Sequence, residues 1–116
     1  MRYAQLNSQY YCGIDLHSRT MYICVMDKQG HILLHRNMED NFVQFQKYLE
    51  PFLPSVAVGV ESSCYYYWLS DKCKQANIDF YLGHAFYMKA ISGGKVKNDR
   101  IDSRKIADLL RAICSH

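Results

Sequence analysis

The stretch YYCGIDLH, residues 10–17, is typical of a β-strand and sets the frame for the rest of the chain. Its tyrosines, isoleucine and leucine favour an extended backbone. A second run of this kind, TMYICVMD at 20–27, follows a short polar connection, and HILLHRN at 31–37 is a third. The turn sequence KQG at 28–30 separates the second run from the third. Three strands with tight connections predict an antiparallel meander.

Helical and extended patterns alternate after the meander. The run FVQFQKYLEPFL, 42–53, has apolar residues at helical spacing, follows cap residues in the segment 37–40, and ends at two prolines. SVAVGVESS, 55–63, is an apolar strand of the kind that is buried on both faces. We expect Ser62 or Ser63 to cap the next helix, in YYYWLSDKCKQAN.

The remaining segments complete one α/β domain. IDFYLGHA, 78–85, is predicted to be a fifth strand, and a short helix is expected at 86–91 before a glycine pair. The last helix is expected to run from about residue 98 to the end of the chain. The order βββαβαβ, followed by a helix, predicts a mixed sheet with helices packed on it. A length of 116 residues suits a single domain with one core.

Composition places the chain among ordinary globular proteins, with 49% apolar and 22% charged residues. The longest apolar runs are far too short to span a bilayer, and MRYAQLNSQYY at the N-terminus lacks the apolar core of a signal peptide. We therefore predict a cytoplasmic protein. The five cysteines are an odd number and form no CxxC pair, which favours free, mostly buried thiols over a zinc site.

The segment 89–111 is rich in lysine and arginine although the net charge of the chain is only +3. Such clustering suits a polyanion such as nucleic acid. The alternative is a solvated helix face with salt bridges, and charge alone favours that alternative.

The last helix carries two acids where apolar residues are expected. At 100° per residue, its apolar stripe consists of Ile106, Leu109, Leu110 and Ile113. Asp99 and Asp102 fall on the same stripe, whereas Asp108 lies on the opposite side with Arg100, Arg104 and Arg111. Like charges on an inward face repel and lose hydration unless a cation holds them. Helix capping is the alternative, and it explains one aspartate better than two.

Two strands supply matching acids. Asp15 follows Gly13, and Glu61 follows Gly59, each at a spacing of two that places acid and glycine on one face of the sheet. A glycine there admits the close approach of another backbone. We therefore expect the last helix to dock on these glycines, so that four carboxylates converge. Converging oxygens suit Mg²⁺ or Mn²⁺, and a pair of such ions about 4 Å apart supports phosphoryl transfer.

Taken in order, GIDLHSRT at 13–20, VGVESSCYYYW at 58–68 and KNDRIDSRKIADLLR at 97–111 resemble the DEDD transposases, the insertion-sequence family that includes the Piv-type DNA invertases. The third stretch is the most specific, and the resemblance extends from about residue 11 to residue 111. It implies a ribonuclease H-like (RuvC-like) fold. It also implies that catalysis and metal binding belong to one tetrad, formed by Asp15, Glu61, Asp99 and Asp102.

The resemblance also implies a function and partners. Family members recombine DNA with divalent ions during transposition, some are guided by a structured RNA, and a homo-oligomer is expected for the full-length form. The residues expected to touch nucleic acid are Lys95, Lys97, Arg100, Arg104 and Lys105. Family members continue into a second domain with a nucleophilic serine. We therefore expect residues 1–116 to form a single RuvC-like catalytic domain without that second domain.

Other interpretations of the same residues stay open. A stand-alone RuvC-like nuclease for branched DNA would use the same acids, and a truncated remnant would bind nucleic acid without catalysis. An actin-like or sugar-kinase fragment also opens with GID, but a glycine-rich phosphate turn should follow, and residues 17–19 are His-Ser-Arg. His17 shares a face with Asp15, although a histidine bonded to backbone is more common at a strand end. Tyr66 and Tyr67 lie off their helix stripe, where plain exposure is favoured over base stacking.

Overall fold

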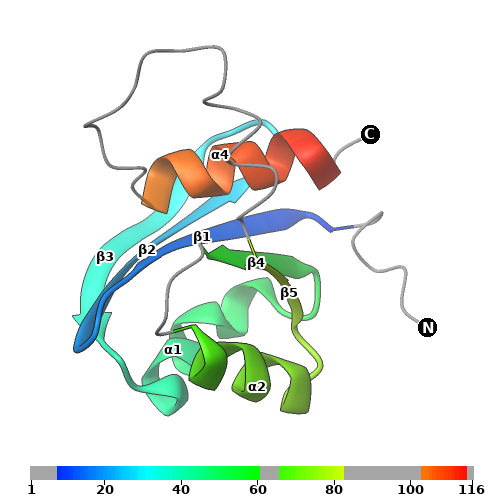
Figure 1. Cartoon of the computed structure of the whole chain (residues 1–116). Coiled ribbons are helices and arrows are strands. Elements are labelled where there is room, and N and C mark those ends of the chain that lie inside the picture. The colour runs from blue at the N-terminus through cyan, green and yellow to red at the C-terminus, as the bar shows by residue number, and fades with distance from the viewer. Residues whose placement is uncertain (1–7, 61–65, 83–102, 115–116) are drawn as a thin grey trace.

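The computed structural model describes residues 8–60, 66–82 and 103–114. These residues form a five-stranded sheet with helices on both sides (Figure 1). The strands are β1 (Tyr10–Leu16), β2 (Thr20–Asp27), β3 (Ile32–Glu39), β4 (Val56–Val60) and β5 (Asp79–Leu82). The helices are α1 (Phe42–Leu49), the 3-10 turn η2 (Glu50–Phe52), α2 (Tyr67–Gln75) and α4 (Ser103–Cys114).

The sheet is mixed, as the sequence predicts, and its strand order is β3-β2-β1-β4-β5. The meander β1-β2-β3 is antiparallel, whereas β4 pairs with β1, and β5 with β4, in parallel. The parallel direction follows from the helices α1 and α2 that precede β4 and β5, because each helix returns the chain to the end of the sheet where the preceding strand began. Strand β4 is buried along its whole length, which confirms the expectation from its continuous apolar run.

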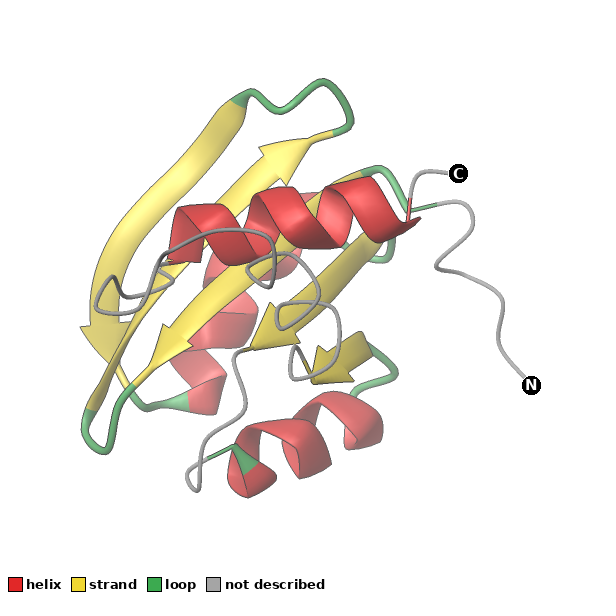
Figure 2. Ribbon diagram, turned by 45° about the horizontal axis from the view of Figure 1, so that its top comes forward, coloured by secondary structure: helices red, strands yellow, loops and turns green. Residues whose placement is uncertain are grey.

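The two faces of the sheet carry different layers. On one face, α1 and α2 cover the larger core, to which Phe45, Leu49, Leu69 and Cys73 contribute. On the other face lies α4, and Figure 2 shows it placed across the sheet. Its smaller core includes Tyr11, Cys24, Met26, Ala57, Ala107 and Leu110. Because strand side chains alternate between faces, every second residue of β1 and β2 points to α4.

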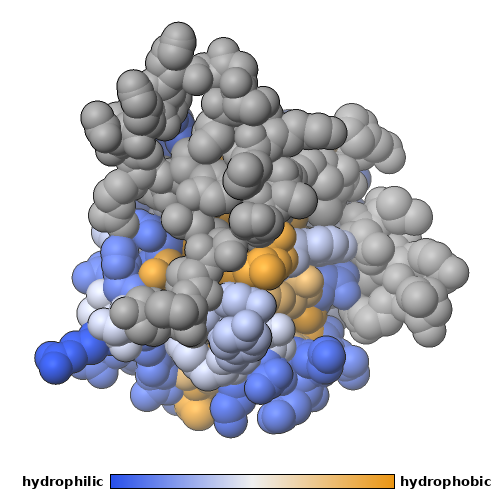
Figure 3. Space-filling model, in the orientation of Figure 1, coloured by the Kyte–Doolittle hydropathy of each residue, from blue (hydrophilic) through white to orange (hydrophobic). Residues whose placement is uncertain are grey.

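Figure 3 shows the hydropathy of the surface in the orientation of Figure 1. In Figure 3 the lower part of the molecule, where α1 and α2 lie, is mostly hydrophilic, and apolar residues show near the middle. Within the part of the chain that the structure describes, no helix is long and apolar enough to cross a membrane.

Helix boundaries differ in detail from the expectation. Asn41, not a residue of the segment 37–40, caps α1, and its side chain accepts a hydrogen bond from the Gln44 amide at 3.2 Å. The segment 37–40 instead extends β3 through Glu39. Helix α2 begins after Tyr66, without a side-chain cap, so the expected serine cap is wrong. The expected helix at 86–91 lies outside the described residues.

Candidate active site

Asp15 occupies a buried position on the α4 face of the sheet. It is the second-last residue of β1, and Gly13 and Tyr11 point to the same face of the sheet. Only 9% of Asp15 is exposed. Among the described residues the buried polar or charged ones are Ser8, Asp15 and Ser103. A buried carboxylate needs a partner or a cation.

His17 lies beside Asp15, as expected from their shared face. Its Nε2 atom is 3.3 Å from Oδ1 of Asp15, and about half of the His17 side chain is exposed. The His17 backbone amide donates a hydrogen bond to the carbonyl of Thr20 at 2.9 Å, which closes the hairpin between β1 and β2. The hairpin thereby holds the imidazole next to the carboxylate.

Gly13 is the point at which α4 docks on β1. A Cβ atom placed on Gly13 would overlap the backbone nitrogen of Ala107 and the carbonyl oxygen of Ser103, and would lie 2.9 Å from Cα of Ala107. The helix backbone therefore rests directly on the strand, which only glycine permits. This confirms the prediction that the last helix docks on the glycine beside Asp15.

Gly59 is the second docking point, and it accommodates side chains instead of backbone. A Cβ atom there would lie 3.1 Å from Cδ2 of Leu110 and 3.7 Å from Cγ2 of Ile106. Gly59 pairs with Gly13 in the parallel register of β1 and β4, and Val60 pairs with Ile14. The two glycines thus form one smooth strip across neighbouring strands, on which the apolar side of α4 lies.

The buried stripe of α4 differs slightly from the prediction. Ile106 and Leu110 are buried as expected, but Leu109 is only half-buried. Ser103 and Ala107 belong to the stripe as well, because the glycine strip lets the helix backbone approach on their side. The side chain of Ile113 lies outside the described residues. The hydroxyl of Ser103 lies 3.4 Å from Nε2 of His35 on β3. The first residue of α4 is therefore fixed above both β1 and β3.

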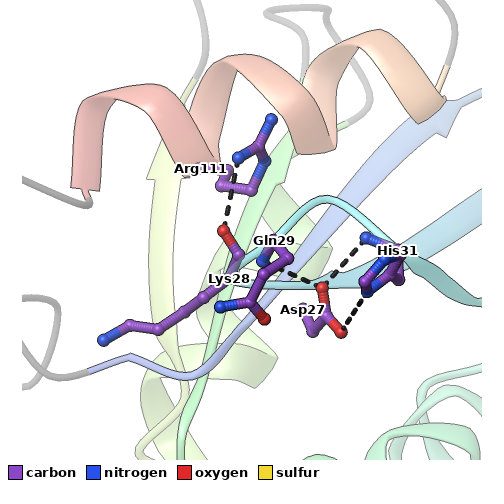
Figure 4. Close-up of polar contacts among 5 residues, drawn as sticks. All are labelled: Asp27, Lys28, Gln29, His31 and Arg111. Carbon is purple, nitrogen blue, oxygen red and sulfur yellow. Dashed lines mark hydrogen bonds and ion pairs between the residues drawn. The ribbon is translucent and has the colours of Figure 1, made fainter.

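Asp108 tests the phase of the helix. It is exposed, and Oδ1 of Asp108 forms an ion pair with Nη2 of Arg111 at 2.6 Å. This confirms that Asp108 faces away from the sheet. Figure 4 shows that Arg111 does not simply face solvent: its Nη1 atom donates to the carbonyl of Lys28 at 3.3 Å. The guanidinium also packs 3.2 Å from the position of a Cβ on Gly30, so it lies over the turn between β2 and β3.

That turn is organised by Asp27. One carboxylate oxygen of Asp27 accepts hydrogen bonds from the amides of Gln29 and His31, both at 2.9 Å, and the other lies 3.1 Å from Nδ1 of His31 (Figure 4). Gly30 has a φ of 88°, a conformation that favours glycine. The backbone amide of His31, followed by its side chain and the Gln29 amide, lowers the pKa of Asp27 from its usual value.

The structure describes only part of the predicted site. Asp15 lies where the sequence places it, and Arg104 and Lys105 are exposed on the first turns of α4. The other predicted residues, Glu61, Lys95, Lys97, Asp99, Arg100 and Asp102, lie outside the described residues, as does the expected start of the helix near residue 98. Within the described ranges no three His, Cys, Asp or Glu side chains come close enough to hold a metal ion.

The described cysteines are structural. Cys12, Cys24 and Cys73 are buried free thiols, as expected. Burial raises the pKa of Cys73 to about 12, and burial, together with the nearby Cys24 and Cys73, raises the pKa of Cys12 well above its usual value. Thiols that hold their protons so firmly are poor nucleophiles and poor metal ligands.

The sequence analysis did not predict which residues of β2 and β3 lie beside Asp15. In the β1–β2 register Asp15 pairs with Tyr22, and in the β2–β3 register Tyr22 pairs with Asn37 and Cys24 with His35. All of these residues share the α4 face by alternation. The signal lay in the period of two along TMYICVMD, which places Tyr22 on the same side as Cys24.

Two comparisons relate this arrangement to known proteins. The fold is similar to that of T. thermophilus RuvC, solved in complex with a Holliday junction substrate, with a TM-score of 0.54 and 16% sequence identity over 93% of this chain and 92% of that chain. The architecture is therefore the RuvC-like, ribonuclease H-type α/β fold. A search among curated proteins gave no match.

The family follows from a sequence profile. The transposase profile of the IS110 DEDD family matches residues 12–115, which is nearly the whole chain. The chain belongs to this family of DEDD transposases, which are metal-dependent enzymes of DNA recombination. The family and the fold that the three motifs predict are therefore confirmed.

Proposed function

We propose that residues 1–116 form the catalytic domain of a DEDD transposase, in which Asp15, Glu61, Asp99 and Asp102 bind divalent metal ions for phosphoryl transfer on DNA. The observation that carries the proposal is the contact of the α4 backbone with Gly13, two residues from the buried Asp15. Gly13 and Asp15 are two residues apart in the strand, which is roughly 7 Å. The start of α4, which lies over Gly13, is therefore close enough for a side chain there to approach Asp15.

Chain connectivity supports a position close to Asp15 for two of the other acids. Asp102 is bonded to Ser103, so their Cα atoms are about 3.8 Å apart, and Ser103 is fixed over Gly13. Glu61 is bonded to Val60, the last residue of β4, which pairs with Ile14. Asp102 and Glu61 are thus each bonded to a residue that lies near Asp15, namely Ser103 and Val60. Asp99 precedes Ser103 by four residues, which is about one helical turn if the helix extends toward it.

The donor set suits hard cations. Carboxylates gathered on a face with little water repel one another, and a bound cation relieves that repulsion. Oxygen donors of this kind favour Mg²⁺ or Mn²⁺, and we propose two ions. When bound, such ions stabilise the charge that develops on a phosphoryl group and on its leaving oxygen. In this proposal the docked helix brings Asp99 and Asp102 toward Asp15 and Glu61 on the strands.

DNA is the proposed substrate, and basic residues beside the acids would hold it. Arg104 and Lys105 are exposed on the first turns of α4, directly after the Asp102–Ser103 bond. Lys95, Lys97 and Arg100 precede them in the sequence and extend the basic segment. Contacts of this kind position a phosphate backbone without selecting its sequence. A structured guide RNA, a homo-oligomeric full-length form and a cytoplasmic location are further parts of the proposal.

The test is a calorimetric titration of Mn²⁺ into the parent chain and into Asp102→Asn, with and without branched DNA. We expect Asp102→Asn to fold normally, because it relieves repulsion, and to bind Mn²⁺ at least about tenfold more weakly, because it removes a ligand. Asp108→Asn is the matched control on the exposed side of the same helix.

Asp108→Asn removes an exposed ion pair with Arg111, which is worth no more than about 1 kcal/mol, and should leave Mn²⁺ affinity unchanged. Equal ion affinity in the parent chain and Asp102→Asn would contradict the four-carboxylate site. Equal losses in both variants would show that the effect belongs to the helix and not to one ligand.

A further inference from the structure

Tyr22 is an exposed aromatic residue in an otherwise covered strand. Of the eight residues of β2, five are buried, Thr20 and Asp27 are half-buried, and Tyr22 is 41% exposed. It lies on the α4 face, where the next residues of that face along the strand, Cys24 and Met26, are covered by Ala107 and Leu110. Its hydroxyl has no hydrogen-bond partner among the described residues. Packing within the described fold therefore does not account for the ring.

The ring lies directly beside the proposed metal site. Tyr22 pairs with Asp15 in the antiparallel register, so the two Cβ atoms are about 4.5–5.5 Å apart on one face of the sheet. Asp15 is buried at 9% exposure, while its cross-strand neighbour stays open to solvent. A group that reaches the Asp15 carboxylate from solvent on this side therefore passes the tyrosine ring.

His35 holds the tyrosine ring in place. The two rings meet edge to face, with centroids 4.9 Å apart and planes inclined by 66°. The Nε2 atom of His35 also lies 3.4 Å from the hydroxyl of Ser103, so the imidazole is held between the helix start and the tyrosine. An aromatic ring with a fixed orientation loses little conformational freedom when a flat ligand stacks on it.

Positive charge lies on the same flank of α4. Arg111 is anchored over the turn between β2 and β3, which defines the side of the helix that faces those strands. Arg104 precedes it by seven residues, so it lies on the same flank about 10 Å toward the start of the helix, where Ser103 meets His35. Arg104 is exposed. This side of α4 thus combines an aromatic ring and a cation next to the proposed carboxylate site. Glu39, which pairs with Thr20, is the last residue of β3 on this side.

We propose that Tyr22, held by His35, is a stacking platform for an unpaired base of the DNA next to the phosphate that reaches Asp15, and that Arg104 contacts the adjoining phosphate. The combination of an aromatic face with a basic neighbour is how single-stranded nucleic acid is bound without sequence preference. A paired base in a duplex is already stacked, so the occupant is a base at a branch or in an open strand. This inference rests on the proposed function, because the base is placed by its bond to that phosphate.

The experiment measures binding of a four-way DNA junction, with 2-aminopurine at the crossover, to the full 116-residue chain by anisotropy and by 2-aminopurine emission. We expect Tyr22→Ala to weaken binding about 5- to 100-fold and to abolish the change in emission. Tyr22→Phe, which keeps the ring, should bind like the parent chain. If Tyr22→Ala does not fold, Tyr22→Leu replaces it, with the same expectation.

Tyr67→Ala is the matched control, because Tyr67 is 64% exposed and lies on α2, on the opposite face of the sheet. It should leave junction binding unchanged. Parent-like binding by Tyr22→Ala, or an equal loss in Tyr67→Ala, would overturn the platform while leaving the proposed function intact. Absence of junction binding by the parent chain would overturn the platform and the proposed function together.

Discussion

Replacing Gly13 by alanine is the sharpest test of how α4 is held. The added methyl group would meet the backbone of α4, namely the nitrogen of Ala107 and the carbonyl oxygen of Ser103, with Cα of Ala107 at 2.9 Å. Comfortable contact between carbon atoms begins near 3.5 Å, so the helix has to move by more than about half an ångström. Backbone atoms cannot rotate away as side-chain ends can. The helix must therefore shift as a body or leave the sheet.

The size of the effect follows from what the helix buries. Overpacking of a close contact typically costs about 1–3 kcal/mol. Complete undocking would expose Ile106 and Leu110, which are 2% and 1% exposed, at roughly 1.5–3 kcal/mol for each side chain. We therefore expect Gly13→Ala to lower the free energy of unfolding by about 2–4 kcal/mol, a large part of the stability of a small domain.

The assay is urea unfolding followed by circular dichroism and by the fluorescence of Trp68, the single tryptophan, which lies in α2 on the opposite face. Hydrogen exchange at residues 106–110 reports on α4 itself. Gly59→Ala is the control, since its methyl group would meet only side-chain ends of Leu110 and Ile106, at 3.1 and 3.7 Å. We expect a change within about 1 kcal/mol there.

Equal stability of Gly13→Ala and Gly59→Ala, with unchanged exchange protection of α4, would refute the docking argument. If α4 moves instead, Asp102 moves with Ser103, so Gly13→Ala should also lose Mn²⁺ affinity although no carboxylate has been removed. That joint loss would connect the packing of the helix with the proposed site.

The remaining predictions concern ionisation. Because burial raises the pKa of Cys12 and Cys73 above the usual 9.0, the folded state retains protons that the unfolded state releases. Stability should therefore fall above pH 9, by up to about 1.4 kcal/mol per pH unit for each thiol, as denaturation between pH 8 and 11 will show, and neither thiol should react with Ellman's reagent before unfolding. The pKa of Asp27 is lowered, so the stability that its carboxylate contributes should be fully present above pH 3.8. That contribution should be lost as the pH falls through the pKa of the folded state. An NMR titration that gives Asp27 a pKa of 3.8 or higher would contradict this.

Much of the fold could be predicted from local patterns. The alternating and continuous apolar runs of the first 60 residues correspond to β1–β4, and the prolines after Leu49 end α1 and confine the next residues to η2. The first residues of α1 and α2 differ from the prediction, because a cap depends on which backbone amides a turn leaves unpaired. Asn41, and not a residue before it, meets that need at the start of α1.

The candidate site shows the same division. The two Gly-x-acid pairs and the phase of the last helix predicted where α4 docks, and Asp15, Gly13 and Gly59 lie accordingly. The role of Arg111 could not be predicted, because its contact with the carbonyl of Lys28 joins residues 83 positions apart. The pairing of Tyr22 with Asp15 likewise depended on the strand register.

By itself, the sequence determined the class of fold and the family, because periodicity, glycine spacing and motif order are properties of neighbouring residues. The four acids of the metal site stay a prediction. Tertiary structure alone decided how closely α4 approaches the sheet, and that Ser103 and Ala107 rather than Leu109 meet it. It also decided that Tyr22 adjoins Asp15 and that His35 packs against the ring of Tyr22. The physical reason is that register and docking are set by close contacts between distant segments, where the space left by one missing side chain selects the arrangement.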